Sequence, residues 1–204
     1  SRNNILKVET LKKENQSEYI YQLERQIISI LLKYGAEEIL FEDIILNKNE
    51  KGEIVESKKE IRSKVFEKIY LDLQQDEIEF THGPFKEIYN KLINSFHNQK
   101  LVSIDSFIND LEPSSSKIVS DILINDEKYQ LHDWEKKNIY VKKIGSELSQ
   151  LVNETILNMR RYLIDKKITE LQDNSKDDKD KVLEEVMSYY SLKKLLSAKL
   201  NRVV

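Results

Sequence analysis

Glycine and proline are scarce in this chain, with four glycines and two prolines among 204 residues. An all-β sandwich or barrel contains many tight turns, and those turns depend on glycine and proline. Because glycine and proline are also the residues that interrupt helices, their scarcity leaves long stretches in which helices can continue. We expect an all-α fold.

The first part of the chain predicts a compact bundle of helices. Residues 1–16 are polar with isolated apolar positions, and we interpret them as a linker. From Ser17 apolar residues recur at helical spacing, and Gly35 stands where a helix takes its C′ glycine. Residues 36–56 combine an apolar run with a turn-like polar segment, so a short helix and a small β hairpin are both compatible with them. We expect residues 17–143 to form the body of the fold, a helical bundle with an ordered connector at its end.

Start signals mark further helices in this body. Ser57–Glu60 has the form of a capping box, which predicts a helix that runs to about Gln75. Gly83-Pro84 places proline in the first turn of another helix, where its missing N–H costs nothing. Ser103 can cap a short helix, and Ser114–Ser116 can open the next one.

The last part of the chain, residues 144–204, predicts a long connecting helix and a C-terminal helical hairpin. The connector before it, residues 126–143, has no long helical period but is rich in aromatic residues. Ser146 can cap a helix of about 27 residues, roughly 40 Å long at 1.5 Å per residue. The polar break at 174–180 separates it from a second helix with apolar residues from Val182 onward. Two helices joined by a short loop form an antiparallel hairpin.

Most catalytic, metal and membrane chemistry has no support in the sequence. There is no cysteine, so thiol nucleophiles, disulfides and cysteine-bound zinc are excluded. The three histidines, His82, His97 and His132, have no metal-ligand spacing and are expected to be packing or surface residues. The acidic pair Asp178 and Asp180 is best explained as a solvated helix start. No glycine-rich phosphate loop, membrane span or signal peptide is recognisable, so we expect no enzyme activity, no cofactor, no catalytic or metal site and a cytoplasmic protein.

The charge distribution singles out the end of the chain. The formal net charge is −3, which argues against a general nucleic-acid binder. Acidic residues accompany the basic pairs near residues 136–167, but none occurs from Val186 to Val204, where basic residues accompany leucines. The leucines there span more of the helix circumference than one neighbouring helix usually covers. We therefore expect this helix either to bind a protein partner or to fold back on the body.

Several strings in this order resemble the C-terminal, helicase-binding domain of bacterial replicative DNA primase. Asp76–Phe80 (DEIEF) and Pro84–Tyr89 (PFKEIY) are similar to a stretch of that family, and Phe107–Asn109 (FIN) resembles one of its turns. Tyr129–Lys137 (YQLHDWEKK) followed by Ile139–Val141 (IYV) resembles the connector found in one branch of these primases. The family's terminal hairpin also has its counterpart here.

The resemblance covers roughly residues 17–204 and is weakest at residues 36–58. It implies a non-catalytic domain that docks primase onto the N-terminal domain of the replicative hexameric helicase during DNA replication priming. The family's zinc-binding and polymerase modules have no counterpart in this chain, so we assign no catalytic residue. We do not expect direct nucleic-acid binding by this chain. The resemblance, carried onto the terminal helix, implies these partner-binding residues: Tyr189, Tyr190, Leu192, Lys193, Leu196, Lys199, Leu200 and Arg202.

Two other functions are compatible with the sequence. The chain could be a stand-alone helical adaptor that binds another protein, which would keep the architecture without the helicase. It could also be a single-stranded nucleic-acid-binding module that uses the basic end of the terminal helix, in which case its affinity would fall steeply with added salt.

Overall fold

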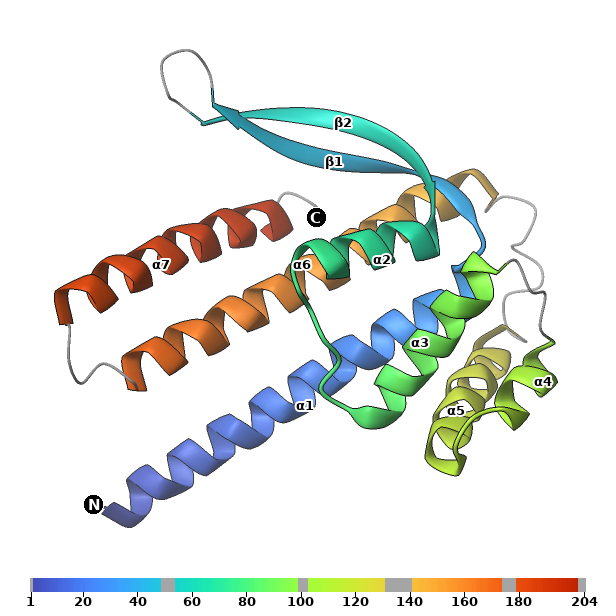
Figure 1. Cartoon of the computed structure of the whole chain (residues 1–204), viewed down its shortest axis with the longest axis horizontal. Helices are drawn as coiled ribbons and strands as arrows, with labels where there is room; N and C mark the ends of the chain where they lie inside the picture. Colours follow the sequence, from blue (N-terminus) through green and yellow to red (C-terminus); the bar gives the residue numbers. More distant parts are fainter. Residues whose placement is uncertain (1, 49–53, 99–102, 131–140, 174–178, 202–204) are drawn as a thin grey trace. The chain divides into compact units, whose positions relative to one another are not determined.

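The fold is all-α with one added β hairpin, which confirms the predicted class (Figure 1). A computed structural model describes residues 2–48, 54–98, 103–130, 141–173 and 179–201. Within these ranges the elements are α1 (Arg2–Tyr34), β1 (Glu38–Lys48), β2 (Ile54–Lys64), α2 (Val65–Gln75), α3 (Gly83–His97), α4 (Ile104–Asn109), α5 (Pro113–Gln130), α6 (Val141–Asp173) and α7 (Lys179–Asn201).

The chain divides into two compact units, and α1 and α6 each contribute to both. One unit consists of residues 27–152 and the other of residues 1–26 together with 153–204. The sequence-based division placed a boundary at residue 143 and treated residues 1–16 as a linker. The structure instead makes Arg2 the first residue of α1 and groups the N-terminal part of this helix with the terminal hairpin.

The β hairpin resolves the ambiguity of residues 36–56 and corrects the start of the next helix. β1 and β2 pair antiparallel over their full length, from Glu38 opposite Lys64 to Lys48 opposite Ile54. Ser57 lies opposite Ile45 in this register, so the helix predicted to start at Ser57–Glu60 is wrong. The capping-box string describes only local hydrogen bonds. Pairing with the β-branched run of β1 satisfies the same backbone groups, so this segment forms a strand and not a helix.

The actual start of α2 is fixed by a glutamate one turn inside the helix. Glu67 accepts a hydrogen bond from the backbone N–H of Lys64 at 3.3 Å and one from the Ser63 hydroxyl at 3.2 Å. This arrangement satisfies an N-terminal amide that has no partner inside the helix. The N–H groups of Val65 and Phe66 donate to the carbonyls of Glu37 and Gly35, so the start of α2 is attached to the end of α1.

Gly35 ends α1, as predicted, but space rather than backbone conformation requires the glycine. A Cβ atom at Gly35 would lie 2.5 Å from the carbonyl oxygen of Leu31 and 2.6 Å from Cε2 of Phe96. The Phe96 ring stacks on Phe66 with ring centroids 4.9 Å apart, so it is held in place by its neighbour. The absence of a side chain at Gly35 thus allows α3 to approach the end of α1.

The helices α3, α4 and α5 begin close to where their sequence signals predict. Pro84 lies in the first turn of α3, and the Ser103 hydroxyl accepts a hydrogen bond from the Ser106 N–H at 3.2 Å, which caps α4. α3 packs against α5, and α4 also packs against α5. Their buried faces belong to the core of the unit formed by residues 27–152, which includes Ile27, Phe41, Phe66, Phe85, Ile88 and Val119.

The predicted connector at residues 126–143 is partly helical. α5 continues to Gln130 and α6 already begins at Val141, before the Ser146 cap that the sequence suggested. Gly145 therefore lies inside α6, where glycine costs about 1 kcal/mol relative to alanine but does not prevent helix formation. Residues 131–140, which carry Trp134 and His132, lie outside the described residues.

Glu87 of α3 accepts two hydrogen bonds from the start of α5. Its carboxylate accepts a hydrogen bond of 2.6 Å from the buried Ser115 hydroxyl and one of 3.2 Å from the Glu112 N–H at the start of α5. Lys91, one turn further along α3, lies 3.1 Å from the same carboxylate. The Ser115 hydrogen bond is the largest cause that lowers the pKa of Glu87 below its ordinary value of 4.5, while burial opposes the shift.

This carboxylate is expected to make stability depend on pH. A lowered pKa in the folded chain means that the ionised form stabilises the fold above pH 4.5, and that this contribution is lost as the pH falls through the folded-state pKa. Glu87→Gln should therefore lower the urea midpoint at pH 7 more than at pH 3. In a Ser115→Ala background, the effects of Glu87→Gln at the two pH values should be closer to each other. Urea denaturation at both pH values tests this. An equal loss for Glu87→Gln at pH 7 and pH 3 would show that the carboxylate charge is not involved.

Candidate functional site: the exposed row of the terminal helix

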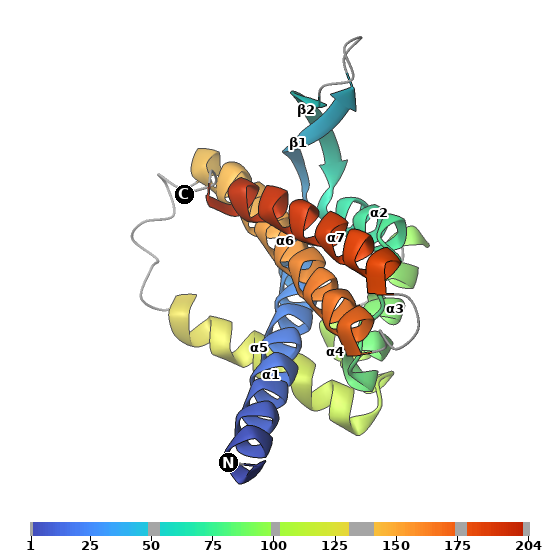
Figure 2. The same cartoon turned by 90° about the vertical axis from the view of Figure 1, so that its left-hand side faces the viewer.

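The C-terminal part of α6 and the whole of α7 run side by side as an antiparallel helical hairpin, here called the terminal hairpin (Figure 2). Ile164 and Ile168 of α6 pack with Val186 and Leu196 of α7, and all four side chains are buried. Partly buried apolar residues surround this core, namely Leu157, Leu171, Val182 and Tyr189. The hairpin thus has a hydrophobic core of its own, which fixes the rotation of α7 about its axis.

A different face of α7 leaves large apolar side chains in solvent. Leu183 is 58% exposed, Met187 62% and Tyr190 49%. The steps of four and three residues between them place these side chains on one side of the helix, along about 10 Å of its length at 1.5 Å per residue. We call Leu183, Met187 and Tyr190 the exposed row. Contiguous apolar surface of this kind is typical of a site that binds another protein.

Exposure of the row follows from the apolar circumference of α7. At about 100° per residue, the row lies roughly a quarter of a turn away from Val186 and Tyr189, which face α6. One neighbouring helix covers a single stripe of its partner, so apolar residues outside that stripe stay exposed. Exposed apolar side chains do not stabilise the isolated chain, whereas burying each of them in a complex would contribute at most about 1.5–3 kcal/mol.

The partner-binding residues expected from the sequence do not form one surface. Leu196 is only 7% exposed and belongs to the hairpin core, and Tyr189 is partly buried against that core. Lys193 forms an ion pair of 2.5 Å with Asp165 of α6. Leu196 is therefore occupied within the hairpin, and Leu196→Glu would disrupt its core instead of testing a contact with a partner.

Two of the expected residues do expose apolar surface. Tyr190 belongs to the exposed row, whereas Leu192, which is 43% exposed, points to the opposite side of α7, since two residues turn a helix by about 200°. The remaining expected residues lie outside the described side chains: Lys199, Leu200 and Arg202.

A protein-family model described as "Domain of unknown function (DUF8430)" matches residues 12–203. The chain belongs to the DUF8430 family. No curated protein and no solved structure matches it significantly. The matched residues of this DUF8430 chain include the entire terminal hairpin and therefore all of the exposed row.

Sequence reasoning missed Leu183 and Met187 of the DUF8430 chain. The expected set was carried onto the lysine-rich end of the helix, whereas Leu183 and Met187 lie on either side of the acidic residues Glu184 and Glu185. The signal for the row is its spacing, because Leu183, Met187 and Tyr190 are apolar residues four and three positions apart. The sequence could not reveal which of the two apolar stripes faces α6, because that depends on the side chains that α6 presents.

Candidate metal-binding groups, membrane spans and the surroundings of His97 can be described for the part of the chain that the structure covers. No group of three or more histidine, aspartate or glutamate side chains there could hold a metal ion. None of the described helices combines the length and the apolar character that a membrane span requires. His97 lies among the rings of Phe66 and Tyr70, with its Nδ1 atom 2.9 Å from the Ile93 carbonyl oxygen, in agreement with a packing role.

Proposed function

We propose that this DUF8430 chain is the non-catalytic helicase-binding domain of a bacterial DNA primase, and that its terminal hairpin docks on the N-terminal domain of the replicative hexameric helicase. The exposed row on α7 is the observation that carries this proposal. It supplies apolar surface at the end of the chain to which the primase resemblance assigns docking. The eight residues inferred from the sequence are accordingly revised to Leu183, Met187 and Tyr190 as the anchors.

The resemblance to primase is compatible with where its strings lie in the fold. Asp76–Phe80 forms the segment between α2 and α3, Pro84–Tyr89 opens α3, and Phe107–Asn109 closes α4. The connector string begins at Tyr129 near the end of α5, and its last residue, Val141, begins α6. The strings therefore mark junctions between elements, which is where short motifs with a structural role are expected.

The energetics favour docking of moderate strength. Burial of three large apolar side chains contributes at most about 4.5–9 kcal/mol at 1.5–3 kcal/mol each, and association costs about 4 kcal/mol or more in lost freedom, so the row alone supports docking of no more than moderate strength. Affinity would then depend on how well the partner surface fits the row. Moderate affinity suits a tether, because a primase held near the helicase works at a raised effective concentration without staying bound permanently.

A co-elution experiment tests the proposal. The chain and the helicase N-terminal domain should elute together in size-exclusion chromatography at micromolar concentrations, and a titration should saturate. The same chain should give no complex with an unrelated helical domain of similar charge. Separate elution at concentrations up to about 100 μM would contradict the helicase as partner and favour an adaptor function with another protein.

A further inference from the structure

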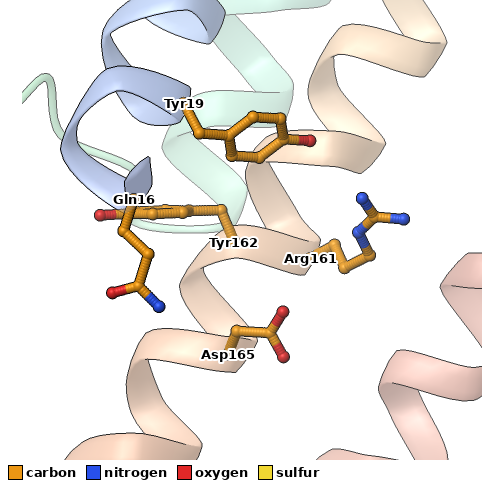
Figure 3. Close-up of a pocket in the computed structure, with 5 residues that line it drawn as sticks. All are labelled: Gln16, Tyr19, Arg161, Tyr162 and Asp165. Atoms are coloured by element: carbon orange, nitrogen blue, oxygen red, sulfur yellow. The ribbon is translucent and has the colours of Figure 1, made fainter. Parts of the chain in front are cut away.

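A small cavity opens beside the terminal hairpin, between α1 and α6 (Figure 3). Its volume is about 320 Å³, and its walls come from one compact unit of the fold. Gln16 and Tyr19 of α1 form one wall, and Arg161, Tyr162 and Asp165 of α6 form the other. The cavity thus brings hydrogen-bond donors, two aromatic rings and both signs of charge together.

Contacts within the protein hold most of this wall in place. The Tyr19 hydroxyl donates to Asn158 Oδ1 at 3.2 Å, and the rings of Tyr19 and Tyr162 lie 6.3 Å apart between centroids. Burial, with a smaller effect of Glu24, raises the pKa of Tyr162, so its phenol stays protonated at neutral pH and can donate a hydrogen bond. Asp165 is neutralised by Lys193 of α7.

Arg161 is the exception among the charged groups of the cavity. Within the described side chains it forms no ion pair or hydrogen bond, although its guanidinium can donate five hydrogen bonds. Since Lys193 pairs with Asp165, Arg161 is the one lining residue whose charge has no ion-pair partner among the described side chains. Figure 3 shows Arg161 and Asp165 projecting toward the same side of α6. The group that pairs best with this guanidinium is an anion with hydrogen-bond acceptors, and a carboxylate matches its planar shape in two parallel hydrogen bonds.

The cavity and the exposed row lie on the same side of the terminal hairpin. On α6, Asp165 follows Ile164 by one residue, so it lies about 100° around the helix from Ile164, which faces α7. On α7, Leu183 and Met187 follow Val182 and Val186 by one residue, so the exposed row is turned away from α6 in the same direction around its own helix. In an antiparallel pair of helices, positions displaced in the same sense from the contact line lie on one side of the pair. The ion pair with Lys193 links Asp165, on that side of α6, to α7.

We propose that Arg161 binds an acidic side chain, Asp or Glu, of the protein partner that covers the exposed row. This inference rests on the proposed function and adds the chemistry that the partner must present, namely an apolar strip with a carboxylate beside it. The Tyr162 hydroxyl and the Gln16 amide, which line the same cavity, offer further donors to the carboxylate. A charge-assisted pair in such a site mainly sets the orientation of docking and the choice of partner.

Affinity measurements on variants of the full chain with the helicase N-terminal domain test the inference. Arg161→Ala should weaken binding about tenfold or more and reduce its salt dependence, as expected for a hydrogen-bonded charge pair. Arg161→Lys should fall between wild type and Arg161→Ala, because lysine keeps the charge but not the fork. Lys167→Ala removes one exposed cation from another side of α6 and should change the affinity by less than about twofold.

The partner residue is found by changing the exposed acids of the helicase domain singly to Asn or Gln. One of these changes should have no further effect in combination with Arg161→Ala, which is the coupling expected of a direct pair. Circular dichroism checks that each variant is folded, and Arg161→Lys decides the test if Arg161→Ala unfolds.

The possible failures are distinguishable. If wild type binds the helicase domain and Arg161→Ala and Arg161→Lys bind equally well, the acidic-partner inference is wrong and the docking proposal stands. If wild type does not bind, both are wrong. If a single-stranded 20-nucleotide DNA displaces the helicase domain and binds wild type but not Arg161→Ala, the cavity takes a phosphate, and the acidic side chain is excluded.

Discussion

Gly35→Ala is expected to lower the free energy of unfolding by about 2–3 kcal/mol, near the upper end of what one added methyl group costs in a packed interior. The new Cβ atom would overlap the Leu31 carbonyl oxygen and the Phe96 ring. The carbonyl belongs to the last turns of α1 and cannot move without breaking that helix. The ring is stacked on Phe66, so displacing it would also open the contact between α2 and α3.

Gly83→Ala is the matched control for this substitution. A Cβ atom at Gly83 would meet no other atom within 4 Å, and the residue lies in the first turn of α3. Alanine there should be neutral or stabilise the fold by a few tenths of a kcal/mol, because alanine is the better helix former. Urea denaturation followed by circular dichroism measures both variants. Similar small effects at the two positions would mean that α3 does not approach the end of α1 as closely as the structure has it.

Met187→Glu is expected to weaken binding to the helicase N-terminal domain by about 100-fold or more. The substitution places a carboxylate in the middle of the exposed row, where docking would remove it from water without a partner charge, at a cost of several kcal/mol. Met187 is 62% exposed in the free chain, so the glutamate should not affect folding. Fluorescence anisotropy of a labelled helicase domain gives the change in affinity, and urea denaturation verifies the stability of the variant.

Leu71→Glu provides a comparison at a site with almost the same exposure. Leu71 of α2 is 60% exposed and belongs to the other compact unit, away from the terminal hairpin in sequence. The Leu71→Glu variant should bind the helicase domain with the affinity of the wild-type chain. If Leu71→Glu and Met187→Glu weaken binding equally, the effect is general and the exposed row is not the docking surface.

Sequence reasoning succeeded where the determining interactions are local. Pro84 in the first turn of α3 and the Ser103 cap of α4 involve groups within a few residues of each other, and both helices begin as predicted. It failed at Ser57, where the competing partner is Ile45 in a strand twelve positions earlier. A capping signal states what a segment can do alone, whereas pairing with a distant strand depends on a second segment.

The candidate site could be located only to the level of one helix. The lack of acidic residues after Val186 directed attention to α7, and Tyr190 is the one residue shared by the predicted set and the exposed row. Leucine and methionine have similar burial preferences, so composition could not distinguish buried Leu196 from exposed Met187. That difference arises from the rotation of α7, which the packing of Ile164 and Ile168 determines.

Calorimetric titration of the chain into the helicase N-terminal domain at several temperatures tests the central claim most directly. Burial of the exposed row predicts saturable binding with a negative heat-capacity change, since removal of apolar surface from water has that signature. Met187→Glu should abolish the binding heat under the same conditions. Absence of binding by the wild-type chain, or binding with a heat-capacity change near zero that Met187→Glu leaves unaltered, would contradict docking through the exposed row.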